Sequence, residues 1–230
     1  MIRLIILLII CPQILLGQCP TSTVQLNSKA DVDDFAIDYP NCTELNTSLY
    51  IEGADIHDLT PLSNLTHLHM GLLCLDNLLL PILIGLNNVV TMNGIVLLGN
   101  NLLTDLQELN ALEKVLSQFQ IESNLSLESF SGLEELDSIN NQFFIFNNIE
   151  LTNISAIENL EYIGGNIILT NCFELSECSI NSFCDFIEST PGNAFISNNG
   201  DGCNSISDRS RMSSMLNDKC LDWTTVWFVA

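Results

Sequence analysis

Residues 95–139 read IVLLGNNLLTDLQELNALEKVLSQFQIESNLSLESFSGLEELDSI. Within this stretch an apolar residue recurs at every third position over 103–115, and the same series returns over 127–139. Further copies occupy 56–68, 80–92 and 151–163, so that the first members lie at positions 56, 80, 103, 127 and 151. A period of 23 or 24 residues is typical of repeat proteins, in which each unit buries its apolar side against its neighbours.

A short alternating pattern precedes each copy of the series. Ile95 and Leu97, for example, are apolar residues separated by one position. Alternation of this kind is typical of a β-strand that buries every second side chain. The pairs that we expect to point inward are Leu49/Ile51, Leu72/Cys74, Ile95/Leu97, Phe119/Ile121, Phe143/Ile145, Ile167/Leu169 and Ala194/Ile196.

An asparagine recurs after these strands. An amide side chain donates and accepts hydrogen bonds, so each Asn can bond the backbone of its turn and the next Asn along a stack. Cys172 takes this place in the sixth unit. We therefore predict a structural ladder formed by Asn77, Asn100, Asn124, Asn148 and Asn199.

A bundle of amphipathic helices is the alternative that the leucine content raises. An α-helix has about 3.6 residues per turn, so residues spaced three apart are displaced from one another by about 60° around the helix axis. A strict spacing of three would therefore spread the apolar residues around the helix and would not keep them on one face. The spacing instead favours a right-handed parallel β-solenoid of about six rungs with one sheet. Asn93-Gly94, Asn140-Asn141 and Gly164-Gly165 precede strands, and we expect them to supply corners with positive φ.

The open ends of a solenoid need capping structure. Ser28 begins a predicted helix over 28–39 whose apolar side is Val32, Phe35 and Ala36. The helices expected at the other end are 179–189, with Ile180, Phe183 and Ile187 inward, and 206–218. The predicted divisions are 1–18 for a signal peptide, 19–45 for the N-terminal cap, 46–177 for the repeats, 178–220 for the C-terminal cap with the last rung, and 221–230 for a tail.

The first residues have the three parts of a secretory signal peptide. Arg3 supplies a positive charge, an apolar run covers 4–16, and Gly17-Gln18 precedes Cys19. Because a bilayer span needs about 20 apolar residues, we expect the signal to be cleaved and the mature chain not to be transmembrane. A lipid anchor on Cys19 is the alternative, but such an anchor needs a small residue where Gln18 stands.

Nine cysteines are present, and all except Cys11 lie outside the signal. An exported chain reaches an oxidising compartment, so disulfides are expected, whereas the cysteine spacings do not match a zinc site. Cys74 falls on an inward strand position and Cys172 on the position of the recurring Asn, and both are expected to be buried thiols. The positions of the cysteines in the sequence favour the disulfides Cys19–Cys42, Cys178–Cys203 and Cys184–Cys220. The last four cysteines allow three different connectivities.

The chain is strongly acidic, with 28 acidic residues against 6 basic ones and a net charge of −22. Nucleic-acid binding is excluded, because neutralising phosphates requires clustered Lys and Arg. Attraction to anionic lipid by charge is excluded for the same reason. The acidic surface is instead expected to bind Ca²⁺ weakly.

Motifs of catalytic chemistry are missing. The sequence has no Gly-x-Ser-x-Gly elbow, no phosphate-binding glycine loop and no His-Glu-x-x-His helix. His67 and His69 have a metal-like spacing, but no third ligand accompanies them. A polysaccharide-cleaving β-helix is the enzyme alternative, yet Lys114 is the only basic residue over 30–208, and a lyase normally needs a cation. We expect no enzyme activity, no defined metal site and no cofactor.

Four stretches resemble receptor L-domain-like proteins secreted by marine Bacteroidetes. They are 39–66 (YPNCTELNTSLYIEGADIHDLTPLSNLT), 160–171 (LEYIGGNIILTN), 175–187 (LSECSINSFCDFI) and 194–205 (AFISNNGDGCNS), and the resemblance covers roughly residues 19 to 220. It implies a leucine-rich-repeat-like solenoid similar to the L domains of insulin- and epidermal-growth-factor-receptor ectodomains. It also implies a binding role outside the cell or at its surface, with no catalytic residues. Such bacterial proteins often continue into a C-terminal sorting domain, for which residues 221–230 are too short.

The outward positions of the predicted strands form a candidate binding face: Tyr50, Leu73, Val96, Gln120, Phe144 and Ile168. Five of these six residues are apolar or aromatic, which is unusual for a solvated face. We therefore predict a secreted or cell-surface recognition or adhesion module for a protein or glycan ligand. A structural spacer without a ligand is the remaining alternative.

Overall fold

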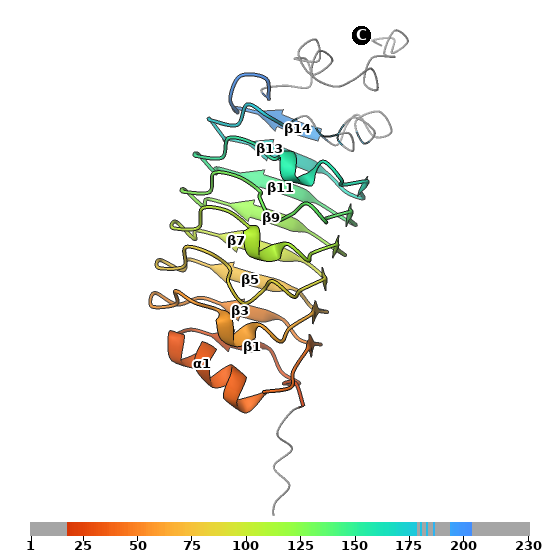
Figure 1. Cartoon of the computed structure of the whole chain (residues 1–230). Helices are drawn as coiled ribbons and strands as arrows, with labels where there is room; N and C mark the ends of the chain where they lie inside the picture. The colour runs from red at the N-terminus through yellow and green to blue at the C-terminus, as the bar shows by residue number, and fades with distance from the viewer. Residues whose placement is uncertain (1–17, 179, 181–182, 184–185, 187–193, 204–230) are drawn as a thin grey trace, which may run out of the picture.

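The computed structural model describes residues 18–178, 180, 183, 186 and 194–203. Most of this part of the chain forms parallel strands in two sheets, with few helices. In the large sheet, each strand between the two edge strands is hydrogen-bonded to the strand one repeat before it and the strand one repeat after it (Figure 1). Its strands in order are β1 (Val24–Leu26), β3 (Leu49–Ile51), β5 (Leu72–Leu75), β7 (Ile95–Leu98), β9 (Phe119–Glu122), β11 (Phe143–Phe146), β13 (Ile167–Thr170) and β14 (Ala194–Ser197).

A second sheet is built from strands of only two residues each. Its members are β2 (Glu44–Leu45), β4 (His67–Leu68), β6 (Thr91–Met92), β8 (Lys114–Val115), β10 (Ser138–Ile139) and β12 (Tyr162–Ile163). The prediction of one sheet was therefore wrong. Two residues are too few for an alternating pattern, and the inward residue of each strand after β2 is the last member of the step-of-three series.

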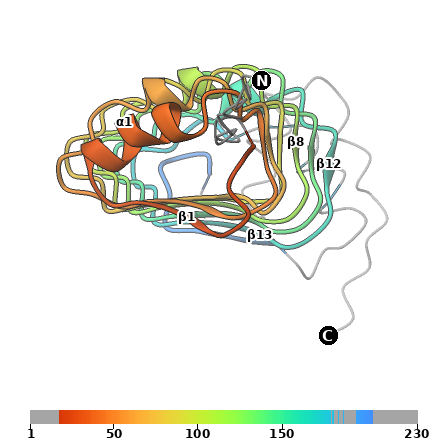
Figure 2. The same cartoon turned by 90° about the horizontal axis from the view of Figure 1, so that it is seen from below.

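The helical segments lie opposite the large sheet. They include α1 (Lys29–Asp38) and the 3₁₀ helices η1 (Thr60–Leu62), η2 (Gln107–Leu109) and η3 (Ser155–Ile157). Figure 2 looks along the stack and shows the large sheet on one side, the small sheet on the adjoining side, and α1 with the 3₁₀ turns across from the large sheet. This stacking of parallel repeats is compatible with a solenoid-like β fold.

The N-terminal segment contains both a strand and the expected helix. Ser28 caps α1, since its hydroxyl accepts a hydrogen bond from the Asp31 backbone N–H at 3.2 Å. Val32 and Phe35 are buried, whereas Ala36 is only partly buried. The predicted cap also holds β1, which pairs in register with β3 and begins the large sheet one strand earlier than expected.

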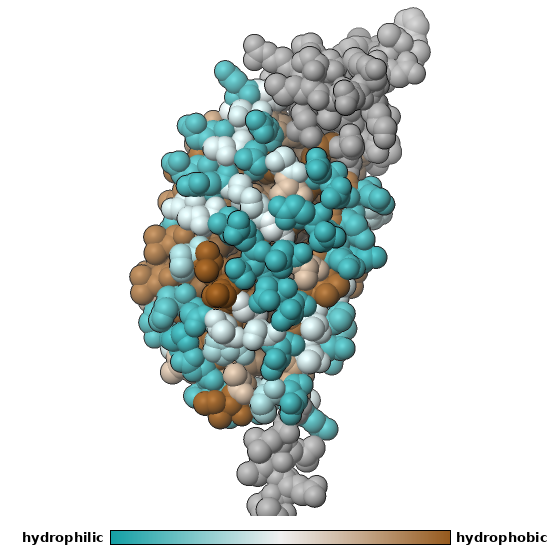
Figure 3. All heavy atoms as spheres, in the orientation of Figure 1, coloured by the Kyte–Doolittle hydropathy of each residue, from teal (hydrophilic) through white to brown (hydrophobic). Residues whose placement is uncertain are grey.

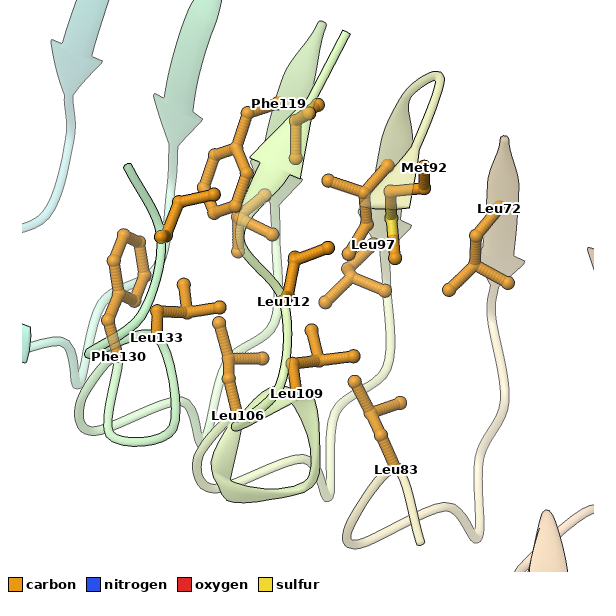
Figure 4. Packing of buried hydrophobic residues seen from close by; sticks show 14 of the residues in the cluster. Leu72, Leu83, Met92, Leu97, Leu106, Leu109, Leu112, Phe119, Phe130 and Leu133 are labelled. Carbon is orange, nitrogen blue, oxygen red and sulfur yellow. The ribbon is translucent and has the colours of Figure 1, made fainter. Parts of the chain in front are cut away.

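The core is a continuous column of apolar side chains between the sheets and the 3₁₀ side (Figure 4). All members of the step-of-three series are buried, as are the inward strand residues. Aromatic rings fill the middle, where Phe119 stacks on Phe143 with ring centroids 5.6 Å apart and meets Phe130 edge-on at 6.0 Å. Each rung therefore contacts its neighbours through side chains as well as through the sheets.

Asn77, Asn100, Asn124, Asn148 and Asn199 are buried. The first four are bonded to one another along the stack, whereas Asn199 accepts a hydrogen bond from the Cys172 backbone N–H at 3.0 Å. The amide oxygen of Asn124 accepts from the backbone N–H of Asn100 at 3.0 Å, and that of Asn148 accepts from the Asn124 backbone N–H at 3.0 Å. Their amide nitrogens donate to strand carbonyls, such as that of Leu97 at 2.9 Å from Asn124. The ladder thus satisfies backbone groups that the turns leave inside the fold.

The corners with positive φ do not lie where the glycine pattern suggested. The residues at 93–94, 140–141 and 164–165 have no positive φ. A recurring left-handed residue instead comes directly before the ladder position, at Asp76, Gly99, Ser123, Asn147, Asn171 and Asn198. This backbone reversal follows β5, β7, β9, β11, β13 and β14 and directs the next side chain into the core. Gly164 serves a close approach, because a Cβ there would lie 2.3 Å from the Asn140 carbonyl oxygen.

Two disulfides join Cys19 to Cys42 and Cys178 to Cys203, which are two of the pairings that position favours. Cys184, Cys220, the signal peptide through residue 17, the helix over 206–218 and the tail over 221–230 lie outside the described residues. Of the predicted helix over 179–189, Ile180, Phe183 and Phe186 are described and buried, whereas Ile187, the third residue predicted to point inward, lies outside the described residues. Among the described residues, no helix is both long and apolar enough to cross a membrane.

Candidate functional site

The outer face of the large sheet is the candidate site. Strand pairing places Tyr50 opposite Leu73, Val96 opposite Gln120, and so on, so that the six predicted face residues form one unbroken row. All six are partly exposed, while their neighbours on either side along each strand are buried. The row continues to Gln25 at one end and to Phe195, which is 57% exposed, at the other.

A second outward row runs beside the first. The large-sheet strands β5, β7, β9, β11 and β13 have four residues each, so their last residues also face outward. These residues are Leu75, Leu98, Glu122, Phe146 and Thr170. Sequence reasoning missed this row, because only the first three residues of each strand were read as alternating. The signal that could have found it was the fixed distance to the ladder asparagine.

The polar residues of the face are joined by hydrogen bonds on β9. Gln118, just before the strand, donates its amide N–H to the side-chain oxygen of Gln120 at 3.3 Å. Gln120 in turn donates to Oε2 of Glu122 at 2.8 Å. The chain of amides therefore holds the Glu122 carboxylate in place in the middle of the face.

Apolar side chains lie on both sides of this polar line. Towards β5 the rows present Leu73, Leu75, Val96 and Leu98, which are aliphatic. Towards β14 they present Phe144, Phe146, Ile168 and Phe195, which are mainly aromatic. The rings of Phe144 and Phe146 are 6.1 Å apart and tilted by 33°. The face therefore has an aliphatic part, an anionic centre and an aromatic part.

A further apolar area lies on the turns after β5 and β7. Leu78, Leu79 and Leu102 are exposed there. Figure 3, which views the molecule from the side of the 3₁₀ helices, shows this hydrophobic area at the edge formed by those turns. These residues come from turns without strand pairing, so they do not form in-register rows like those of the sheet face.

The groups with shifted pKa values lie away from this face. Burial raises the pKa of the Cys74 thiol to about 12 and that of the Cys172 thiol to about 11. A hydrogen bond from the Thr60 hydroxyl lowers the pKa of Asp58, which lies near η1. The two thiols are therefore protonated and inert at neutral pH.

The remaining polar groups form no evident reaction centre in the described part of the chain. The rings of His67 and His69 are 5.9 Å apart, and Nε2 of His69 lies 3.2 Å from Oε2 of Glu44. In the described part of the chain, no three His, Cys, Asp or Glu side chains are grouped so that they could hold a metal ion. A cavity of about 270 Å³ between α1 and β1 has Asp31, Asp34 and Asp38 among its lining residues.

Comparison of the chain with protein-family models, with curated proteins and with solved structures found no match.

Proposed function

We propose that this protein is a secreted or cell-surface recognition module that binds a protein or glycan through the outer face of its large sheet. The observation that carries this proposal is the pair of in-register rows, in which most side chains are apolar although they reach the solvent. A Leu or Phe side chain left in water forgoes about 1.5–3 kcal/mol relative to burial. Contiguous apolar side chains on a surface are typical of a binding site.

The fold suits such a role because the core and the face are separate. Inward residues of each strand are buried and define the stack, whereas the outward residues contact solvent. Substitutions on the outward rows can therefore change specificity without disturbing the core. We propose a right-handed solenoid of the receptor L-domain type, which agrees with the general right-handedness of crossovers between parallel strands.

Export is supported by two independent features. The sequence begins with the pattern of a secretory signal, and two cysteine pairs are close enough to form disulfides. Disulfides persist mainly in oxidising compartments. We therefore propose that the protein acts outside the cell or on its surface.

The test is binding of the folded chain to arrays of glycans and of extracellular proteins, with and without Ca²⁺. The double variant Tyr50→Ala/Phe144→Ala removes two aromatic side chains from the first row. The matched control is Tyr162→Ala/Phe173→Ala, which removes the same two residue types from positions that are 55% and 57% exposed outside the face. Circular dichroism melting should show that both variants are folded.

We expect the face variant to lose at least about tenfold in affinity while the control variant binds normally, because burial of large aromatic side chains dominates interface energies. Equal binding by the two variants would indicate that the binding site lies outside the face of the large sheet. Absence of binding by the folded chain on both arrays would favour a structural spacer and contradict the proposal.

A further inference from the structure

The centre of the sheet face combines one charge with apolar neighbours on both sides. In the second row Leu98 pairs with Glu122, and Glu122 pairs with Phe146. The first row repeats the arrangement with Val96, Gln120 and Phe144. A ligand that crosses the strands here therefore meets apolar, polar and apolar groups in that order.

The carboxylate of Glu122 is oriented and available for a partner. Oε2 accepts the amide hydrogen bond of Gln120 at 2.8 Å, and no described residue donates a hydrogen bond to Oε1. The side chain is partly exposed, so a donor can approach it from solvent. A cationic N–H donor forms the stronger, charge-assisted hydrogen bond with such an oxygen.

A polypeptide fits this face better than a glycan does. Sugars carry hydroxyl groups on most carbons, and burying a hydroxyl without a hydrogen bond is unfavourable. Leu73, Leu75, Val96 and Leu98 have no side-chain group that could hydrogen-bond a hydroxyl. An acidic glycan would also be repelled by a chain of net charge −22.

The same charge makes a second copy of this chain a poor occupant. Lys29 and Lys114 are the basic residues in the described part, and both are engaged in ion pairs. Lys29 contacts Asp33 and Asp58, and Lys114 lies 3.6 Å from Asp137. A partner that brings its own unpaired cation gains more at Glu122.

The spacing of the rows indicates the form of the partner. Neighbouring strands lie about 4.8 Å apart, so Leu98 and Phe146 are separated by about 9.6 Å across Glu122. An α-helix rises about 10.5 Å between positions i and i+7, with i+4 between them on the same side. In an extended peptide, side chains on the same side are about 6.8 Å apart. This spacing differs from the distance of about 4.8 Å between strands, so the peptide side chains no longer lie opposite the sheet residues after two strands.

We infer that the partner is a cationic amphipathic helix that lies across strands β7, β9 and β11, with Lys or Arg at its centre against Glu122. Apolar side chains one turn before and one turn after that residue contact Leu98 and Phe146. This inference rests on the proposed function and specifies the partner class of the same face.

The experiment is selection of a displayed library of helical peptides on the folded chain. The peptides have an alanine-rich scaffold and random residues at positions i, i+4 and i+7 of one side. We expect enrichment of apolar residues at i and i+7 and of Lys or Arg at i+4. A selected peptide, and its version with Gln at i+4, are then titrated against the chain and two variants by fluorescence anisotropy.

The variants are Glu122→Gln and, as a matched control, Glu161→Gln, an exposed carboxylate just before β12. We expect Glu122→Gln to weaken binding of the basic peptide by about five- to tenfold and to leave the Gln peptide unaffected. The control should change neither affinity by more than about twofold. Enrichment without a basic residue, or equal effects of the two variants, would overturn the inference.

The array experiment separates this inference from the proposed function. Glycan binding that requires Tyr50 and Phe144, together with no peptide enrichment, would overturn the helix inference and keep the recognition module. Absence of peptide, glycan and protein binding would overturn both.

Discussion

Asn124 illustrates how a single side chain holds two rungs together. Its amide oxygen accepts from the Asn100 backbone N–H, and its amide nitrogen donates to the Leu97 carbonyl. Alanine at this position leaves both backbone groups buried without partners, and each unpaired group costs about 1–3 kcal/mol. We expect Asn124→Ala to lower the free energy of unfolding by about 3 kcal/mol in urea denaturation.

The control for this prediction is Asn140→Ala, because Asn140 is exposed at its corner. Its free energy of unfolding should change by no more than about 0.5 kcal/mol. Equal destabilisation by the two variants would mean that the ladder hydrogen bonds add little to stability.

The buried thiols give a prediction about pH. Burial raises the pKa of Cys74 from an ordinary value of 9.0 to about 12, so the folded state holds this proton more tightly than the unfolded state does. The resulting stabilisation is complete below pH 9 and is lost as the pH rises towards 12. We expect the unfolding free energy to fall over this range, and iodoacetamide to leave Cys74 unmodified at pH 8 until the chain unfolds.

Mass spectrometry of the alkylated peptides checks the second part of this prediction residue by residue. Cys172, whose pKa is raised to about 11, should be protected in the same way. Rapid labelling of either thiol in the folded chain at pH 8 would contradict their placement in the core.

At the scale of elements, close contact between successive turns depends on particular glycines. Gly132 has φ 104°, and a Cβ there would lie 2.2 Å from the Leu106 carbonyl oxygen just before η2. Both the conformation and the contact oppose any larger residue. We expect Gly132→Ala to destabilise the fold by about 3 kcal/mol in urea denaturation, through backbone strain and displacement of the turn.

Gly94→Ala is the matched control, because a Cβ at Gly94 meets its nearest atom, the Gln118 carbonyl oxygen, only at 3.3 Å. This substitution should change stability by less than about 1 kcal/mol. If both variants were equally stable, the turns would not be packed as tightly as the distances indicate.

The elements differ in how well the sequence predicts them. Strands of the large sheet were predictable, because buried pairs such as Phe119 and Ile121 alternate with partly exposed residues. The small sheet was not, since a strand such as Lys114–Val115 contains one buried residue and no period. The second outward row was missed because Glu122 and Thr170 are polar and so do not continue an apolar pattern in the sequence. Strand pairing alone places Glu122 beside Leu98 and Thr170 beside Phe146.

At the scale of the whole molecule, the net charge of −22 acts on stability. Repulsion among carboxylates opposes the compact state, and salt screens it. We therefore expect the melting temperature, followed by circular dichroism, to rise as NaCl is increased from low to physiological ionic strength. CaCl₂ at equal ionic strength should raise it further if the acidic surface binds Ca²⁺, and a fall with NaCl would contradict dominant repulsion.

The whole stack and its outer face rest on the same in-register pairing. The repeat length alone predicted that strands one period apart would be neighbours, and the pairing of Tyr50 with Leu73 and of Phe144 with Ile168 has that register. The sequence could not predict the ligand, because outward side chains are not constrained by the core.

The most direct measurement is the affinity of the array-selected ligand for the two double variants, determined side by side. Our account predicts at least about a tenfold loss for Tyr50→Ala/Phe144→Ala and normal binding for Tyr162→Ala/Phe173→Ala. Normal binding by the folded face variant would contradict the claim that the outer face of the large sheet is the recognition site.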